Sequence, residues 1–164
     1  MKRIGLLSDT HGWLDDSVFR HFASCDEVWH AGDFGTIDVS KKLSDFKPLR
    51  GVFGNIDGTD IRVLHPETLC WTCEELKVLM VHIGGYPGRY SPKAKAELDL
   101  HRPGLFLTGH SHILKVMPDP KRACLHMNPG AAGRQGWHRV RTLIRFSVDG
   151  RDIRDLSVVE LGAR

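Results

Sequence analysis

Long apolar runs are missing from this 164-residue sequence, and tyrosine occurs only twice. No stretch approaches the roughly 20 apolar residues that a membrane-spanning helix needs, so we expect no membrane partner. The apolar run of residues 4–7 ends at Ser8-Asp9. This run is too short for a signal-peptide core, which predicts a cytoplasmic protein. Internal repeats, low-complexity segments and linkers are also lacking. We therefore expect a single domain over residues 1–164.

Cysteine is scarce, and the four present do not form a structural zinc site. Cys70 and Cys73 make one Cys-x-x-Cys pair, but no second ligand pair lies at the spacing that a closed zinc site requires. A redox pair would open a helix after a strand, whereas this pair falls in a predicted strand-turn region. We expect four reduced cysteines, most of them buried.

A strong charge of one sign is lacking too, since 23 basic residues oppose 20 acidic residues for a net charge of +3. Residues 115–164 nevertheless carry 10 basic and 5 acidic residues. Such an excess could attract an anionic substrate or nucleic acid, and a solvated face of an antiparallel sheet would also explain it. No basic stretch is interleaved with aromatic residues, so nucleic acid is not the favoured partner.

The first third of the sequence alternates between short apolar runs and amphipathic segments. This alternation predicts parallel strands joined by crossover helices. The predicted strands are 2–7, 27–30 and 49–53, and the predicted helices are 14–23 and 37–46. The remainder favours strands at 61–64, 68–72, 75–81, 104–107, 140–148 and 152–161, with one helix at 91–100. Ser91-Pro92 is a typical start for that helix, and Asp149-Gly150 predicts a hairpin between the last two strands.

Histidine is abundant, with ten residues, and several follow the predicted strands together with aspartate or asparagine. Ligands bind open parallel sheets at the carboxyl edge of the strands, so we expect these side chains to converge. Oxygen and imidazole donors suit Mn²⁺, Fe or Zn²⁺. Seven such residues are too many for one tetrahedral ion but fit two ions that share a carboxylate, as in phosphate ester hydrolysis. The seven are Asp9, His11, Asp33, Asn55, His82, His110 and His112.

Each of these residues alone has a simpler interpretation as a helix cap, a turn residue or a buried histidine. His30 could orient a ligand or be a structural histidine, and Asp57 could bond near the metals or only close a turn. The other five histidines are expected on surfaces or in loops; they are His21, His65, His101, His126 and His138.

Five short motifs occur in the order found in the calcineurin-like metallophosphoesterases, which the sequence resembles from residue 4 to about residue 133. These motifs are Asp9-Thr10-His11, Gly32-Asp33, Gly54-Asn55, His82 and Gly109-His110-Ser111-His112. The short length and Asn128-Pro129-Gly130 resemble the small bacterial and archaeal phosphodiesterases of this superfamily. The resemblance implies an α/β fold, a four-layer α/β/β/α sandwich of two mixed sheets flanked by helices.

The resemblance also implies a role for each residue. One ion would be held by Asp9, His11, Asp33 and His112, and the second by Asp33, Asn55, His82 and His110, which would be the catalytic residues. The implied ions are two Mn²⁺, with Fe, Zn²⁺ or Ni²⁺ as alternatives. A hydroxide between them would attack a small-molecule phosphate ester, with a diester as the favoured substrate. Arg134 would bind substrate phosphate. A homo-oligomer, dimeric or larger, is implied as well, with Trp137 as a possible contact.

One position departs from the wider superfamily. Many members have Gly-Asn-His, whose histidine can protonate the leaving group, whereas this sequence has Ile56 after Asn55. General-acid help is typically worth about 10²–10⁴-fold in rate, so we expect weak action on poor leaving groups. Two alternatives stay open: a phosphomonoesterase or nuclease with the same metals, and a non-catalytic scaffold such as the retromer subunit of this fold.

Overall fold

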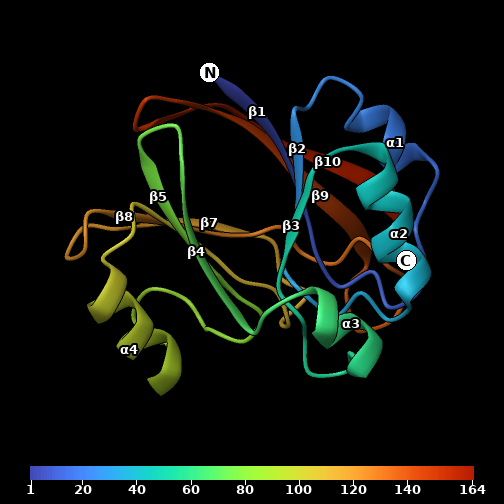
Figure 1. Cartoon of the computed structure of the whole chain (residues 1–164), viewed down its shortest axis with the longest axis horizontal. Coiled ribbons are helices and arrows are strands. Elements are labelled where there is room, and N and C mark those ends of the chain that lie inside the picture. Colours follow the sequence, from blue (N-terminus) through green and yellow to red (C-terminus); the bar gives the residue numbers. More distant parts are fainter.

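Two five-stranded sheets face each other in the computed structural model, which describes all of residues 1–164, and helices cover their outer faces (Figure 1). The predicted four-layer α/β/β/α sandwich is confirmed. The first sheet has the order β10-β9-β1-β2-β3 and the second the order β4-β5-β6-β8-β7. Both sheets are mixed, because β1, β2 and β3 are parallel, as are β5, β6 and β8, whereas the remaining pairs are antiparallel.

The colours in Figure 1 follow the chain from blue to red, and the chain contributes elements to both sheets. The first sheet and its helices comprise β1 (Lys2–Leu7), α1 (Ser17–His21), β2 (Glu27–His30), α2 (Ile37–Phe46), β3 (Leu49–Gly51), α3 (Thr59–Leu64), β9 (Val140–Asp149) and β10 (Asp152–Ala163). The second sheet and its helix comprise β4 (Thr68–Cys73), β5 (Leu76–Val81), α4 (Pro92–His101), β6 (Leu105–Leu107), β7 (Lys115–Asp119) and β8 (Cys124–Asn128). None of the helices is long and apolar enough to cross a membrane.

Three apolar clusters hold the layers together. The largest lies between the sheets and joins side chains of β1, β2 and β9 to side chains of β4, β5, β6 and β8. Trp29 of β2 is fully buried there, and its ring lies 4.9 Å from that of Trp71 in an edge-to-face arrangement. A second cluster packs α1, α2 and α3 on the first sheet, and a third packs α4 on the second. The alternating apolar positions of the strands therefore supply two buried faces per sheet.

Several predicted elements differ from the structure. Residues 61–64 were expected as a strand but belong to α3. Ile61 is the buried residue of this helix, and its packing against α2 outweighs the strand preference of the β-branched residues. The helix predicted at 14–23 is only α1, and β3 ends at Gly51. Strands β7 and β8 were not predicted, because β7 is an edge strand that contains Pro118 and shows little alternation.

Other local predictions are confirmed. The Ser91 side chain accepts a hydrogen bond from the Ala94 N–H, and Pro92 is the first residue of α4. β9 and β10 form the expected hairpin, although its two-residue turn is Gly150-Arg151 rather than Asp149-Gly150. All four cysteines are free thiols and three are buried.

Parallel pairing brings the ends of distant strands to one edge. In the first sheet Leu7 pairs with His30, and His30 pairs with Gly51. In the second sheet Met80 pairs with Leu107, which pairs with Met127. The loops that follow these strands carry the motifs noted in the sequence, so the two sheets present them side by side.

Candidate metal centre

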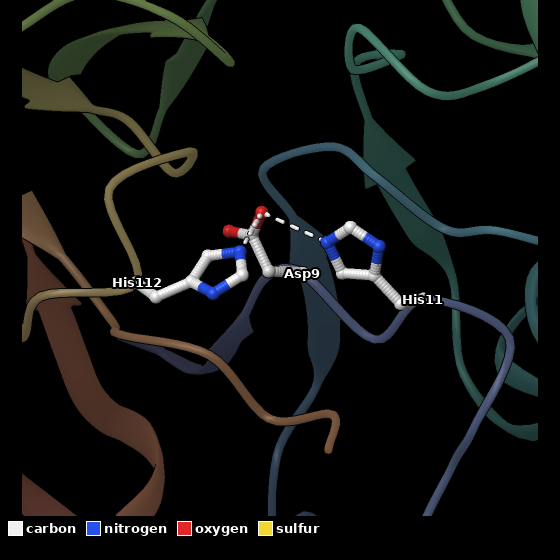
Figure 2. Close-up of side chains that lie close together, drawn as sticks. All are labelled: Asp9, His11 and His112. Atoms are coloured by element: carbon white, nitrogen blue, oxygen red, sulfur yellow. Dashed lines mark hydrogen bonds and ion pairs between the residues drawn. The ribbon is translucent and has the colours of Figure 1, made fainter. Parts of the chain in front are cut away.

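Asp9, His11 and His112 form one group in which the potential ligand atoms all lie within 4.8 Å of one another. Asp9 Oδ1 lies 3.1 Å from His112 Nε2 and 3.7 Å from His11 Nε2. Figure 2 shows both imidazole rings turning a nitrogen toward the Asp9 carboxylate from opposite sides. The loops after β1 and β6 therefore meet at this carboxylate, although His112 lies 103 positions after Asp9.

Asp33, His82 and His110 form a second group within the same 4.8 Å limit. His82 Nε2 lies 3.1 Å from Asp33 Oδ2. Asn55, from the loop after β3, places its Oδ1 3.0 Å from His110 Nδ1. All seven residues singled out in the sequence thus lie in these two groups or in direct contact with them.

The two groups are contiguous through Asp33. Its Oδ2 atom lies 3.4 Å from His11 Nε2 in the first group, besides its short approach to His82 in the second. A second link joins Asp9 Oδ1 to His82 Nε2 at 3.8 Å. A carboxylate between two sets of imidazoles is the arrangement that two neighbouring cations can share.

Two imidazole nitrogens in the centre lack the hydrogen bond that burial normally demands. His11 Nε2 and His82 Nε2 are both buried without a hydrogen-bond partner. The other ring nitrogen of His82 lies 2.7 Å from the Ala31 carbonyl, so it carries the proton and leaves the Nε2 lone pair free. Unpaired buried acceptors beside two carboxylates fit a divalent cation, and the donor set suits Mn²⁺, Fe or Zn²⁺.

The aspartates and histidines of the centre affect one another's pKa values. Burial alone would raise the pKa of Asp9, but the neighbouring imidazoles of His11 and His112 hold it well below its usual range. The same contact with Asp9 raises the pKa of His11. Burial works against protonation of His82, yet the Asp33 carboxylate, whose Oδ2 lies 3.1 Å from His82 Nε2, raises the pKa of His82 overall. The Asp9 carboxylate therefore stays ionised and favours positive charge around it.

The backbone at the centre is strained. Five of the nine non-glycine residues with positive φ are candidate ligands: Asp9 (54°), His11 (47°), Asp33 (58°), His110 (71°) and His112 (61°). Such left-handed conformations cost free energy in residues with a Cβ atom and cluster at functional sites. The surrounding packing therefore has to hold these loops in place.

Glycines beside the ligands leave the space that this packing needs. A Cβ atom on Gly32 would lie 2.5 Å from His82 Nδ1. One on Gly54 would overlap the Asp33 carboxylate, and one on Gly109 would lie 2.8 Å from Asp9 Oδ2. Each motif glycine thus allows close approach of a ligand that comes from another loop.

Asp57 joins two of the ligand loops. Its carboxylate accepts hydrogen bonds from the backbone N–H groups of Phe34 (3.2 Å), Gly35 (2.9 Å) and Gly54 (2.8 Å). It therefore does more than close the turn before Gly58, because it fixes the loop of Asp33 against the loop of Asn55.

Asn128 has a similar role that sequence reasoning missed. Its side-chain amide donates to the Gly109 carbonyl (2.9 Å) and to Ser111 Oγ (3.1 Å), which holds the loop of His110 and His112. The signal that could have revealed it is its position in Asn128-Pro129-Gly130, which in the sequence indicated only a resemblance to a family segment.

His30 supports the ligand loops without touching a ligand side chain. Its Nδ1 accepts a hydrogen bond from the Gly32 N–H (3.1 Å), so Nε2 carries the proton and donates to Thr10 Oγ1 at 3.1 Å. Complete burial holds the pKa of His30 well below its usual value.

The expectation of a surface or loop position is wrong for His126, whereas His65 does lie in the loop after α3. Both are buried: His126 is on β8, an inner strand of the second sheet, and His65 packs on α2 through a 2.8 Å hydrogen bond with Ser40 Oγ.

Arg134 lies next to the centre but outside the ligand groups. Its guanidinium is 4.3 Å from the ring of Trp13. The N–H of the preceding residue, Gly133, donates to the Asp9 carbonyl at 3.1 Å, which ties this loop to the first ligand loop. A pocket of about 310 Å³ lies beside His110, and another of about 550 Å³ lies beside Asn55 and His82.

Residues 1–151 match the family model of the calcineurin-like phosphoesterase superfamily domain, and the chain belongs to this superfamily. Among solved structures, a predicted phosphoesterase from Streptococcus pneumoniae is similar at 22% identity and a TM-score of 0.73, over 97% of this chain and 89% of that one. No curated protein matches.

Two further solved structures share the fold. An archaeal phosphodiesterase is 19% identical with a TM-score of 0.74, over 96% of this chain and 99% of that one. Wild-type Vps29 from Entamoeba histolytica in complex with Zn²⁺ is 14% identical with a TM-score of 0.73, over 96% and 98%. Identities this low show a common fold, while the superfamily itself implies divalent metal ions and phosphoester hydrolysis.

Proposed function

We propose that this protein is a phosphodiesterase that uses two divalent ions, with Mn²⁺ as the ion of choice. The observation that carries the proposal is the shared position of Asp33 between His11 and His82, both of which have an unpaired buried nitrogen. When bound, two such ions would activate water and neutralise charge on the phosphoryl group.

The chain's own residues have defined tasks in this proposal. Asp9, His11 and His112 hold the first ion, Asn55, His82 and His110 hold the second, and Asp33 serves both. Asp9 is fixed further by Ser8 Oγ, which donates to its Oδ2 at 2.6 Å, and by the His110 N–H at 3.1 Å. A rigid ligand set of this kind keeps the reacting groups aligned.

Leaving-group protonation is the step with no evident residue. Ile56 is 46% exposed at the position beside Asn55, and its side chain has no proton to donate. Its backbone N–H donates to Asp33 Oδ1 at 3.1 Å, so this position orients the shared carboxylate instead. We therefore expect rates to depend steeply on the pKa of the leaving alcohol.

Arg134 is proposed to bind a substrate phosphate oxygen, because its loop is tied to that of Asp9. Replacement by glutamine is then expected to raise KM while kcat changes little. Trp137, which is 99% exposed, is proposed as a contact between copies of the chain. Light scattering on the wild type and on Trp137→Ser measures that association.

The test compares bis- and mono-p-nitrophenyl phosphate on protein stripped of metal and reloaded with Mn²⁺. We expect metal-dependent turnover that is faster on the diester, and its loss in Asp33→Asn and His82→Ala. Asp45→Asn is the matched control, because Asp45 is exposed on α2, away from the centre.

The alternatives give different results. Metal binding without turnover of either ester would favour a scaffold. Equal or faster turnover of the monoester would favour a phosphomonoesterase. Undiminished turnover in Asp33→Asn would contradict the site assignment.

A further inference from the structure

The pocket of about 310 Å³ beside His110 contains two cations and no carboxylate in its wall. Arg89 and Lys115 line it, together with Tyr86, Ser91 and His126, among others. Arg89 comes from the glycine-rich loop after β5, and Lys115 begins β7, so the two charges are brought together only by the fold of the second sheet.

Neither cation is paired with an acid. Lys115 Nζ lies 3.6 Å from the centre of the Tyr86 ring, which positions the ammonium without neutralising it. Arg89 forms no ion pair, although it also borders a neighbouring hollow that contains Asp99 and Asp119. Both of those carboxylates are already within ion-pair distance of Arg122, at 2.8 and 3.7 Å.

The remaining groups in the wall leave this positive charge in place. Burial lowers the pKa of His126 to about 4, so this histidine is neutral at physiological pH. Ser91 caps the N-terminus of the ten-residue helix α4, so the positive end of that helix also lies at the wall. Ile83 and Ile113 give the pocket an apolar part.

His110 and Gly109 connect the pocket to the candidate metal centre. An ester whose phosphorus lies at that centre can therefore extend one arm into the pocket. We propose that this pocket binds one arm of the substrate and selects arms that carry a further negative charge, such as a carboxylate or a second phosphate. This inference rests on the proposed function, because the phosphorus position comes from it.

The test measures binding rather than turnover. Calorimetry on Mn²⁺-loaded protein compares 4-carboxyphenylphosphonate with 4-carbamoylphenylphosphonate, which have the same shape and differ in the charge of the arm. We expect the carboxylate to bind about tenfold more tightly, which corresponds to about 1.4 kcal/mol. In the double variant Arg89→Gln/Lys115→Gln this ratio is expected to fall to about one.

Lys41→Gln is the control for loss of a surface charge, since it removes one positive charge from the exposed face of α2. A ratio near one in the wild type, an unchanged ratio in the double variant, or an equal fall in Lys41→Gln would each overturn the inference. Turnover of bis-p-nitrophenyl phosphate, measured on the same samples, decides the proposed function separately. Circular dichroism establishes that the variants are folded.

Discussion

His11 and His82, which lie against an aspartate, have pKa shifts opposite to those of His30, His65 and His126, whose ring nitrogens bond to neutral groups. In the first set, contact with Asp9 or Asp33 raises the pKa of His11 and of His82. In the second set, burial lowers the pKa of His30, His65 and His126. Both sets are inside the fold, so burial alone does not decide the charge of the ring.

The difference teaches what each set can do. The first set presents unpaired nitrogens beside carboxylates, which is a binding site for a cation. In the second set a ring nitrogen bonds to a hydroxyl or to the main chain, as His126 Nδ1 does with the Phe106 carbonyl at 3.1 Å. Those rings join strands and loops, so the abundance of histidine reflects two separate tasks.

Removing the charge of Asp9 should have the largest effect. Asp9→Asn leaves His11 and His112 facing a neutral amide, and we expect the metal content to fall and turnover to drop at least about a hundredfold. Metal analysis and the rate on bis-p-nitrophenyl phosphate measure both effects. Unaltered metal content would show that the carboxylate is not what distinguishes the first set of histidines.

The second set predicts a pH dependence of stability. The pKa of His126 is about 4 in the fold against 6.5 normally, so the unfolded chain takes up a proton first as the pH falls. Its contribution is present above pH 6.5 and is lost toward pH 4, which amounts to roughly 3 kcal/mol. Urea unfolding at pH 7 and pH 4 should show this loss in the wild type and less of it in His126→Gln. His21→Gln, at the end of α1, should behave like the wild type.

Gly54→Ala tests the support of the shared carboxylate. The new methyl group would overlap Asp33, so we expect a loss of about 1–3 kcal/mol in the free energy of unfolding, together with reduced turnover. Gly58→Ala in the same loop is the control, because the nearest atom to its methyl group is Asp60 Oδ1 at 3.6 Å. Equal stability of the two variants in thermal unfolding would contradict the tight fit.

Ser8→Ala should have the smallest effect. It removes the hydrogen bond to Asp9 Oδ2 but leaves the carboxylate and its histidines, so metal affinity is expected to fall about tenfold. Competition with a metal chelator measures this affinity. Ser44→Ala on the exposed side of α2 is the control, and a similar loss there would remove the specific role of Ser8.

Sequence patterns predicted the parts of the fold that depend on local order. The parallel arrangement of β1, β2 and β3 followed from alternating apolar runs and amphipathic segments, and the cap at Ser91 from two adjacent residues. The edge strand β7 and the short helix α3 were not predicted, because each depends on the neighbouring element it packs against rather than on its own periodicity.

The site shows the same division. Residue types at the ends of predicted strands indicated the seven candidate ligands, and the structure brings them together. Asp57, His30 and Asn128 were undetermined or missed, because their hydrogen bonds join loops from different strands. The burial of His65 and His126 was not predicted, since a buried polar residue is recognised only by the distant partner that satisfies it.

The sequence by itself determined the donor set: imidazole, carboxylate and amide groups, in an order that belongs to the calcineurin-like phosphoesterase superfamily. Only the tertiary structure decided how Asp9 and Asp33 of the first sheet meet His82, His110 and His112 of the second. The apolar cluster between the sheets sets that approach. Side-chain packing of this kind acts between residues far apart in the chain, and no local pattern records it.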